Sequence, residues 1–207
     1  MDNAKFWDGI AEIYDKHAIK KYAQAYADTV ELTRKYLKST DHVLDFACGT
    51  GLTTVELAGN VKTMCAVDIS PKMIELARDK CKKAGITNVT FSCTTLYDEC
   101  LEEGVFDVVL VFNALFALPE QEKVFERIGT LLKPDGMFLS VTDCLAESSL
   151  AYRVSLWMAA RLGKVPCENF YTAKSLKNAV STGGFNIVET YSLYRKPSNL
   201  FIAARKI

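Results

Sequence analysis

The sequence has 207 residues, of which 49% are hydrophobic and 24% charged, with 25 basic and 25 acidic side chains. This length and composition favour one globular domain over residues 1–207, with a core large enough to fold without disulfide bonds. A formal net charge of zero gives no general attraction to a polyanionic backbone, so nucleic acid is not expected as a partner.

The hydrophobic pattern predicts helices and strands that alternate along the chain. In chain order the predicted elements are a helix at 21–38, a strand at 42–46, a helix at 53–58, a strand at 61–67, a helix at 71–84, strands at 88–92 and 106–112, a helix around 124–132, a strand at 137–142, a helix at 173–182 and strands at 185–193 and 199–205. Residues 1–38 are expected to form a helical cover at the N-terminal end.

Three local signals sharpen this pattern. Ser70 precedes Pro71, which is the preferred order of an N-cap and a first helical residue. Residues 106–112 are apolar on both faces, which is typical of the buried centre of a parallel sheet. The last two strands are joined by only four residues, 195–198, and must therefore be antiparallel. We predict an α/β fold with a doubly wound, mostly parallel seven-stranded sheet and a C-terminal antiparallel hairpin.

Cysteines, apolar runs and the first residues bear on the chain's environment. The seven cysteines form no C-x-x-C pair and fit neither a disulfide framework nor a zinc site, so no metal is expected. The longest apolar run, 108–118, is far shorter than the ~20 residues that span a bilayer, so no membrane partner is expected. Residues 1–8 lack the apolar core of a signal peptide, and we expect a cytoplasmic location.

The most informative stretch is the glycine turn, residues 45–51, which follows the first strand. A strand that runs into Gly49-x-Gly51 and then a helix brings backbone N–H groups to the carboxyl edge of the sheet, which suits nucleotides in general. As a dinucleotide fingerprint it fails, because the third glycine position is Thr54. Asp45 at the strand end would also repel a pyrophosphate. A nicotinamide dehydrogenase is therefore disfavoured, and Asp45 makes better sense beside a cation.

With Asp68 ending the second strand, this pattern resembles the class I S-adenosylmethionine-dependent methyltransferases, in particular their small-molecule branch. The resemblance covers nearly the whole chain and implies the Rossmann-like fold predicted above. The matching segments are Phe6-Trp7-Asp8, Ile13-Tyr14-Asp15, Asp45 to Gly51, Ala66 to Ser70, Phe106 to Val109 and Leu132 to Gly136. Ala47 departs from the pattern, because the family usually has glycine there, and its methyl group narrows the approach of the backbone to the cofactor.

The resemblance also implies a role for each residue of the site. Gly49 and Gly51 would let the backbone, with Ala47 and Cys48, pass close to the methionine part of S-adenosylmethionine. Asp45 would attract its cationic side, and Asp68 would accept hydrogen bonds from both ribose hydroxyls. The other expected cofactor-binding residues are Tyr14 as a lid, Ile69 and Met73 against the adenine, Thr95 and Leu96 at its edge, and Asn113 at the methionyl group.

Each of these assignments has a structural alternative. Asp45 and Asp68 could be ordinary strand-end caps, although their joint placement around the glycine turn argues against this. Met73 could be plain core, Tyr14 a packing tyrosine and Asn113 a residue bonded to its own backbone. Cys48 is better explained as a small buried hydrophobe than as a nucleophile, because nothing nearby would lower its pKa.

No side chain stands out as a general base. Of the two histidines, His42 leads into a strand and is expected to be structural, which leaves His17 as a candidate catalytic residue. Four acids follow predicted strands, where such folds place substrates, but solvated loop charges explain them as well. These acids are Asp98, Glu99, Asp143 and Glu147.

We expect an enzyme that methylates a small, partly apolar or aromatic molecule by in-line displacement, and the alternative is a catalytically silent S-adenosylmethionine-binding or interaction protein of the same fold. A helical insertion at 143–171 is expected to cover the acceptor, together with the helix around Tyr14. Its apolar residues would line a pocket or attach the added helix to the sheet; they include Leu150, Val154, Trp157 and Met158. The pattern is compatible with methylation at oxygen, nitrogen, carbon or sulfur, and it predicts no oligomeric state.

Overall fold

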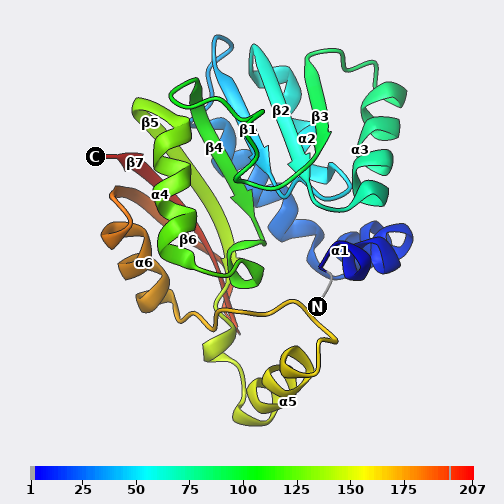
Figure 1. The fold of residues 1–207 in the computed structure, drawn as a ribbon, viewed down its shortest axis with the longest axis vertical. Helices are drawn as coiled ribbons and strands as arrows, with labels where there is room; N and C mark the ends of the chain where they lie inside the picture. Colours follow the sequence, from blue (N-terminus) through cyan, green and yellow to red (C-terminus); the bar gives the residue numbers. More distant parts are fainter. Residues whose placement is uncertain (1–2, 196) are drawn as a thin grey trace.

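One seven-stranded sheet organises the chain, with the strand order β3-β2-β1-β4-β5-β7-β6 (Figure 1). The computed structural model describes residues 3–195 and 197–207; Met1, Asp2 and Lys196 of the predicted segments lie outside them. The strands are β1 (His42–Phe46), β2 (Thr63–Asp68), β3 (Val89–Cys93), β4 (Phe106–Phe112), β5 (Leu132–Asp143), β6 (Phe185–Arg195) and β7 (Ser198–Lys206). β7 is antiparallel to both of its neighbours, and the other pairs are parallel. The predicted fold class is confirmed.

The main helices are α1 (Asn3–Arg34), α2 (Leu52–Leu57), α3 (Pro71–Lys83), α4 (Gln121–Leu131), α5 (Leu150–Arg161) and α6 (Ala173–Thr182). The prediction that the first helix begins at residue 21 is wrong, because helix already begins at Asn3 and is only kinked at Tyr22 (φ −130°, ψ 19°). The prediction that the fifth strand begins at residue 137 is also wrong. Leu132 already pairs with Phe106, beside an irregularity in the β4–β5 register.

Alternating side chains of the strands build a core on each face of the sheet. On one face Leu44 and Phe138 pack with Phe125 of α4 and Leu176 of α6. On the other face Val43 packs in a cluster that includes Val30 of α1 and Leu57 of α2. Val43 and Leu44 are neighbours in β1 and belong to different faces, because successive side chains of a strand point to opposite sides of the sheet.

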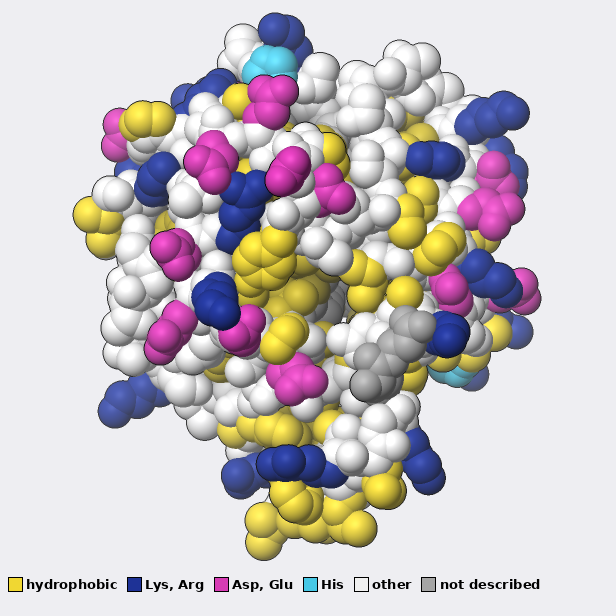
Figure 2. Space-filling model, viewed as in Figure 1, with side chains coloured by type: hydrophobic (Ala, Val, Ile, Leu, Met, Phe, Trp, Pro, Cys, Tyr) yellow, Lys and Arg dark blue, Asp and Glu magenta, His cyan; other side chains and the backbone are white. Residues whose placement is uncertain are grey.

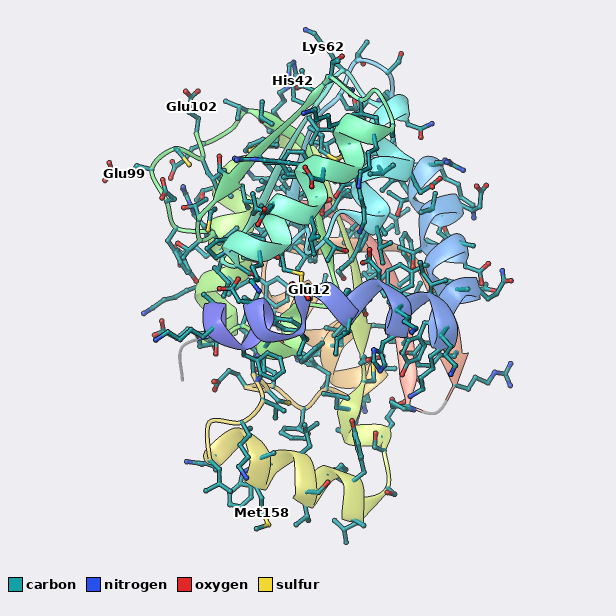
Figure 3. All side chains as sticks on the ribbon, turned by 90° about the vertical axis from the view of Figure 1, so that its right-hand side faces the viewer. Glu12, His42, Lys62, Glu99, Glu102 and Met158 are labelled. Atoms are coloured by element: carbon teal, nitrogen blue, oxygen red, sulfur yellow. The ribbon has the colours of Figure 1, made fainter. Side chains whose placement is uncertain are left out.

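The N-terminal half of α1 lies across the carboxyl ends of the strands, between α3 and α5 (Figures 1 and 3). Ser70 caps α3 by accepting from the Met73 N–H (3.1 Å), and its own hydroxyl donates to Asp8 of α1 (2.6 Å). Asp15 of α1 accepts from the Thr50 hydroxyl and pairs with Lys80 of α3. Asp8 and Asp15, two turns apart, therefore hold this half-helix against the start of α3 and the glycine turn.

The chain between β5 and α6 leaves the sheet, forms α5 and returns. Its base is closed by two contacts: the Ala146 N–H donates to the Tyr171 carbonyl (2.9 Å), and Glu147 accepts from the Ala173 N–H (2.7 Å). Helix α5 contains no buried residue. Both alternatives for its apolar residues Leu150, Val154, Trp157 and Met158 are wrong. Their side chains are 48–71% exposed, so they do not attach the helix to the sheet, and none of them lines the 630 Å³ cavity that is described below.

Candidate active site

The glycine turn after β1 has left-handed backbone conformations at every second residue, Ala47 (φ 59°), Gly49 (φ 55°) and Gly51 (φ 76°). At Gly51 a Cβ would lie 2.9 Å from the Cβ of Ala77, so glycine is needed there for the close approach of α2 and α3. At Gly49 a Cβ would meet nothing within 4 Å, and this position opens toward space. Ala47 holds a conformation that costs an L-residue about 1–2 kcal/mol relative to glycine.

Two buried carboxylates flank this turn. Asp68 is 7% exposed and accepts from the backbone N–H groups of Gly49 and Ser70, both at 2.9 Å. Asp45 is 1% exposed and accepts from the Thr54 hydroxyl at 2.6 Å. Burial raises the pKa of Asp45 to about 6, and the negative charge of Asp68 adds to this rise. Burial also raises the pKa of Asp68, although its backbone hydrogen bonds oppose the rise.

Both carboxylates adjoin small cavities at the carboxyl edge of the sheet. The first, of about 90 Å³, lies between the end of β2, the start of α3 and the end of β4. Among its lining residues are Tyr14, Ala47, Gly49, Asp68, Ile69, Met73 and Asn113. A second space of about 40 Å³ adjoins it and is lined by Asp45 and Cys48, among others. The structure thus brings together nine of the twelve sequence-predicted cofactor residues.

The remaining three lie elsewhere. Gly51 stands behind the turn, against α3. Leu96 is 2% exposed and belongs to the hydrophobic core on the α4 side of the sheet. Thr95 is exposed, and its hydroxyl accepts from the Tyr97 N–H. Neither Thr95 nor Leu96 lines the cavities, so the adenine contacts predicted for them stay a prediction.

A much larger cavity, of about 630 Å³, lies on the other side of Asn113 and Tyr14. Its lining is rich in aromatic side chains, which are Trp7, Tyr14, Tyr22, Tyr26, Phe112, Phe116 and Tyr194. The rings of Tyr22 and Tyr194 are stacked 5.4 Å apart, and the hydroxyls of Tyr14 and Tyr26 are 3.4 Å apart. Trp7, Tyr14, Phe112 and Asn113 also line the 90 Å³ cavity, so they form a wall common to both.

A chain of polar contacts runs along this wall. The Asn199 amide donates to Oδ1 of Asn113 (3.0 Å) and to Oδ1 of Asp143 (2.8 Å), and the Tyr194 hydroxyl donates to the same Asp143 oxygen (2.5 Å). Burial, and then the charge of Asp143, raise the pKa of Tyr194, which therefore stays protonated. Asp143 lines the large cavity and is the one carboxylate among the described residues that does so. The sequence analysis named Asp143 among four acids that follow strands, either near a substrate or as solvated loop charges, and it missed Tyr194 and Asn199.

The other candidate polar residues have clear places. His17 lines the large cavity but is exposed, and its Nδ1 lies 3.1 Å from the Ile13 carbonyl oxygen. His42 is structural, with Nδ1 2.7 Å from the Thr63 hydroxyl. Glu147 holds backbone N–H groups at the base of the α5 excursion. Burial raises the pKa of Cys48 well above its ordinary value, which agrees with an unreactive thiol.

The donor set suits an organic cation better than a metal ion or a phosphate. Across residues 3–195 and 197–207, no group of three or more His, Cys, Asp or Glu side chains could hold a metal. Two buried carboxylates beside one turn repel an anion, and a cation placed between them would offset the cost of keeping them ionised. The sulfonium and ammonium groups of S-adenosylmethionine meet that requirement, and Asp68 has spare acceptor sites for hydroxyl groups.

Comparisons with known proteins agree with this chemistry. Residues 43–136 match a methyltransferase domain family. The chain is 38% identical over 89 residues to a magnesium-protoporphyrin O-methyltransferase from Rhodobacter capsulatus, an alignment that covers 42% of this chain and 39% of that protein. It is 22% identical over 98% of its length to a ubiquinone biosynthesis O-methyltransferase from Coxiella burnetii, of which 86% is covered. The chain therefore spans about two fifths of the first relative's length and most of the second's.

The fold has a close counterpart among solved structures. A geranyl diphosphate C-methyltransferase from Streptomyces coelicolor, determined with Mg²⁺, geranyl diphosphate and S-adenosyl-L-homocysteine, superposes with a TM-score of 0.78. The superposition covers 100% of this chain and 97% of that one at 13% sequence identity. The glycine turn and the paired strand-end acids lie within or beside the matched segment, so residues 43–136 carry a methyltransferase domain, and the seven-stranded sheet has the fold of a solved methyltransferase.

Proposed function

We propose that this protein transfers the methyl group of S-adenosylmethionine to a small acceptor with an apolar or aromatic body. The observation that carries the proposal is the wall of Trp7, Tyr14, Phe112 and Asn113 that two cavities have in common. One cavity is lined by Asp68 and by Ala47 and Gly49 of the glycine turn, and the other is large and aromatic. A donor and an acceptor bound on the two sides of this wall would meet at Asn113.

The donor side would use the residues of the glycine turn and their neighbours. When bound, S-adenosylmethionine supplies a methyl group that is already activated by its positive sulfur. Asp68 would accept hydrogen bonds from the ribose hydroxyls, Ile69 and Met73 would pack against the adenine, and Asp45 would face the cationic end. Tyr14 would close the cavity, since its ring lies 6.4 Å from that of Trp7 and the two line both spaces.

The size and lining of the large cavity support a small acceptor. About 630 Å³ is within the range of small-molecule sites, and aromatic walls favour an apolar or aromatic body. The zero net charge supports a small molecule over a nucleic acid. The two sequence relatives described above are named for magnesium-protoporphyrin and for ubiquinone biosynthesis. The cytoplasmic location stays a prediction.

Asp143 would supply the polar anchor of the acceptor. Its Oδ1 accepts from both Tyr194 and Asn199, which fixes the carboxylate in place. Its Oδ2 is then available to a hydroxyl or amine of the acceptor and could take up the proton as the acceptor atom attacks. In such a transfer the new bond to the methyl carbon forms as the sulfur–carbon bond breaks, and the electron pair of the broken bond stays on sulfur. Alignment of the three atoms in a dry cavity would supply much of the rate.

The test has two stages. Isothermal titration calorimetry with S-adenosylmethionine and S-adenosylhomocysteine should show binding of both, and absence of both would overturn the proposal. The protein is then incubated with methyl-labelled S-adenosylmethionine and a small-molecule extract, and products are identified by mass spectrometry. A labelled small product supports the proposal. Binding without any labelled product favours the silent cofactor-binding alternative, and efficient labelling of protein or RNA would contradict the acceptor class.

A further inference from the structure

Helix α5 presents its apolar side away from the rest of the molecule. At 100° per residue, Leu150, Val154, Trp157 and Met158 share one face of the helix. Their exposed fractions are 71%, 48%, 51% and 52%. Leu156 and Ala159, which are less exposed, lie on the opposite side. A helix of a globular protein normally has the reverse arrangement, with its apolar stripe toward the core.

Positive charge surrounds this apolar side. Between Ser148 and Cys167 the sequence has three basic residues, Arg153, Arg161 and Lys164, and no Asp or Glu. All three are exposed, and the Arg161 guanidinium lies over the Trp157 ring at 5.4 Å. Figure 2 shows the result at the bottom of the molecule, where hydrophobic side chains protrude below a row of Lys and Arg. Met158 sits at the outer side of the helix in Figure 3.

We propose that α5 binds the surface of a bilayer that contains anionic lipids. Aliphatic and aromatic side chains on one face would enter the boundary between headgroups and acyl chains, while the arginines and the lysine would pair with lipid phosphates. Tryptophan favours this depth because its ring is apolar and its N–H is polar. No described helix is long and apolar enough to cross a membrane, and lying on a surface requires only one apolar face.

Charge complementarity selects this occupant over a second copy of the chain. In a two-fold dimer built on α5, the basic residues of both copies would meet with like charge. The helix has 12 residues and is therefore roughly 18 Å long, which is short for a face that must bury ~800 Å² on each partner. An anionic lipid surface needs neither a matching shape nor a large patch, because each basic residue adds its own attraction.

The position of α5 gives such binding a use. The helix lies beyond the carboxyl edge of the sheet, on the same side as the N-terminal half of α1 (Figure 1). Asp143, which lines the large cavity, precedes α5 by only seven positions. A bilayer under α5 would therefore face the edge that carries the cavities, and an apolar molecule could pass from lipid to protein. The binding itself does not depend on methyl transfer.

The sequence offers a direct reporter of insertion. Trp7 and Trp157 are its two tryptophans, so Trp7→Phe leaves Trp157 as the sole source of indole fluorescence. We expect its emission to shift to shorter wavelength with vesicles of phosphatidylcholine and phosphatidylglycerol, but not with phosphatidylcholine alone. Sedimentation of the unmodified full chain with the same vesicles should give the same preference, weakened by added salt.

Matched variants separate the two contributions. Arg153→Gln with Arg161→Gln should lower the affinity for anionic vesicles about 25-fold, at about fivefold for each charge removed. Leu150→Ser with Met158→Ser should also lower it, while Val188→Ser with Tyr191→Ser, at two exposed apolar residues of the edge strand β6, should not. All of these side chains are exposed, so circular dichroism should show every variant folded.

Three results would overturn the proposal. The first is the absence of binding to anionic vesicles, and the second is equal binding to neutral vesicles. The third is a dimer that forms with rising protein concentration, is abolished by Leu150→Ser with Met158→Ser, and occurs without any binding to vesicles. Calorimetry with S-adenosylhomocysteine on the same preparations keeps this test separate from that of the proposed function. Cofactor binding without vesicle binding would refute only the membrane proposal, and vesicle binding without cofactor binding would refute only the enzyme.

Discussion

The backbone N–H of Gly49 donates a hydrogen bond to Oδ2 of Asp68 over 2.9 Å, so the turn after β1 is joined directly to the end of β2. The other carboxylate oxygen accepts from the Ser70 N–H at the start of α3. An ionised carboxylate offers about four acceptor sites, which leaves about two for a ligand. Asp68 thus holds the cavity together and also faces it.

We expect Asp68→Asn to weaken binding of S-adenosylhomocysteine by about ten- to a hundredfold, because a charged acceptor of two hydroxyl groups is lost. Asparagine keeps one carbonyl acceptor for the backbone, so the fold should survive better than with Asp68→Ala. Isothermal titration calorimetry measures the change. Asp79→Asn, on the exposed side of α3, is the control. Equal affinity in both variants would remove Asp68 from the binding site.

Asp45 predicts an unusual dependence of stability on pH. Its pKa is about 6 in the folded protein, above the ordinary value of 3.8, so the folded state binds more protons than the unfolded state between these values. The free energy of unfolding should therefore fall as the pH rises from about 4 to 6, and the full cost is present above pH 6. Asp45→Asn should raise the stability at pH 7.5 by roughly 2–3 kcal/mol and flatten this part of the profile. Urea unfolding across the pH range tests both statements.

The same carboxyl should make cofactor affinity depend on pH. The sulfonium group of S-adenosylmethionine attracts Asp45 only when the carboxyl is ionised, so affinity should rise with pH through about 6. S-adenosylhomocysteine has no charge on sulfur and should show a smaller rise. Titrations of both ligands at several pH values make the comparison. Parallel pH profiles for the two ligands, or an unchanged profile in Asp45→Asn, would speak against a contact with the sulfonium.

Gly51→Ala should destabilise the protein by about 2–4 kcal/mol. The change forces a left-handed conformation on an alanine and places its Cβ 2.9 Å from that of Ala77. Gly49→Ala is a matched control, since its φ is also positive but its Cβ would meet open space. Thermal unfolding of the two variants separates steric overlap from backbone strain. If both lose the same stability, the close approach of α2 and α3 does not matter.

Asp143→Asn should lower kcat/KM for the acceptor by on the order of a hundredfold and leave the affinity for S-adenosylhomocysteine unchanged. Tyr194→Phe should have a smaller effect of the same kind, because Asn199 still holds the carboxylate. Steady-state kinetics with the acceptor found in the extract provide the rates, and Asp98→Asn, on an exposed loop, serves as control. An intact rate in Asp143→Asn would exclude proton transfer to this side chain.

Local signals in the sequence predicted the centre of the fold well. β1 and β4 begin and end where the pattern placed them, and Ser70 caps α3 as its neighbour Pro71 suggests. The sequence placed the first half of α1 within a helical cover over residues 1–38 but did not define where its helix begins, because this half lies across strand ends and buries few side chains there, Ala11 and Ala18 among them. A helix without a continuous apolar stripe shows no 3.6-residue period of apolar residues in its sequence, so its bounds cannot be predicted from that pattern.

The donor side of the site was predictable and the acceptor side was not. Asp45, Gly49 and Asp68 lie in or beside one turn, and their spacing places them together. Asp143 and Asn199 lie far apart in sequence and meet because they are register partners in the β5–β7 ladder. That pairing depends on the hairpin order and register of the last strands, which no local pattern specifies.

Glu147 joins the two ends of the α5 excursion, the segment between β5 and α6, through hydrogen bonds to the backbone. Its two carboxylate oxygens accept from the backbone N–H groups of Ala173 and Ser198, and the Ala146 N–H donates to the Tyr171 carbonyl. The excursion therefore leaves and rejoins the sheet at one closed neck, while its helix adds nothing to the core. The helix Leu150–Arg161 could therefore be shortened, lengthened or exchanged while the core of the sheet keeps its contacts. A related protein with the same sheet could thus acquire a different binding surface through changes in the α5 excursion alone.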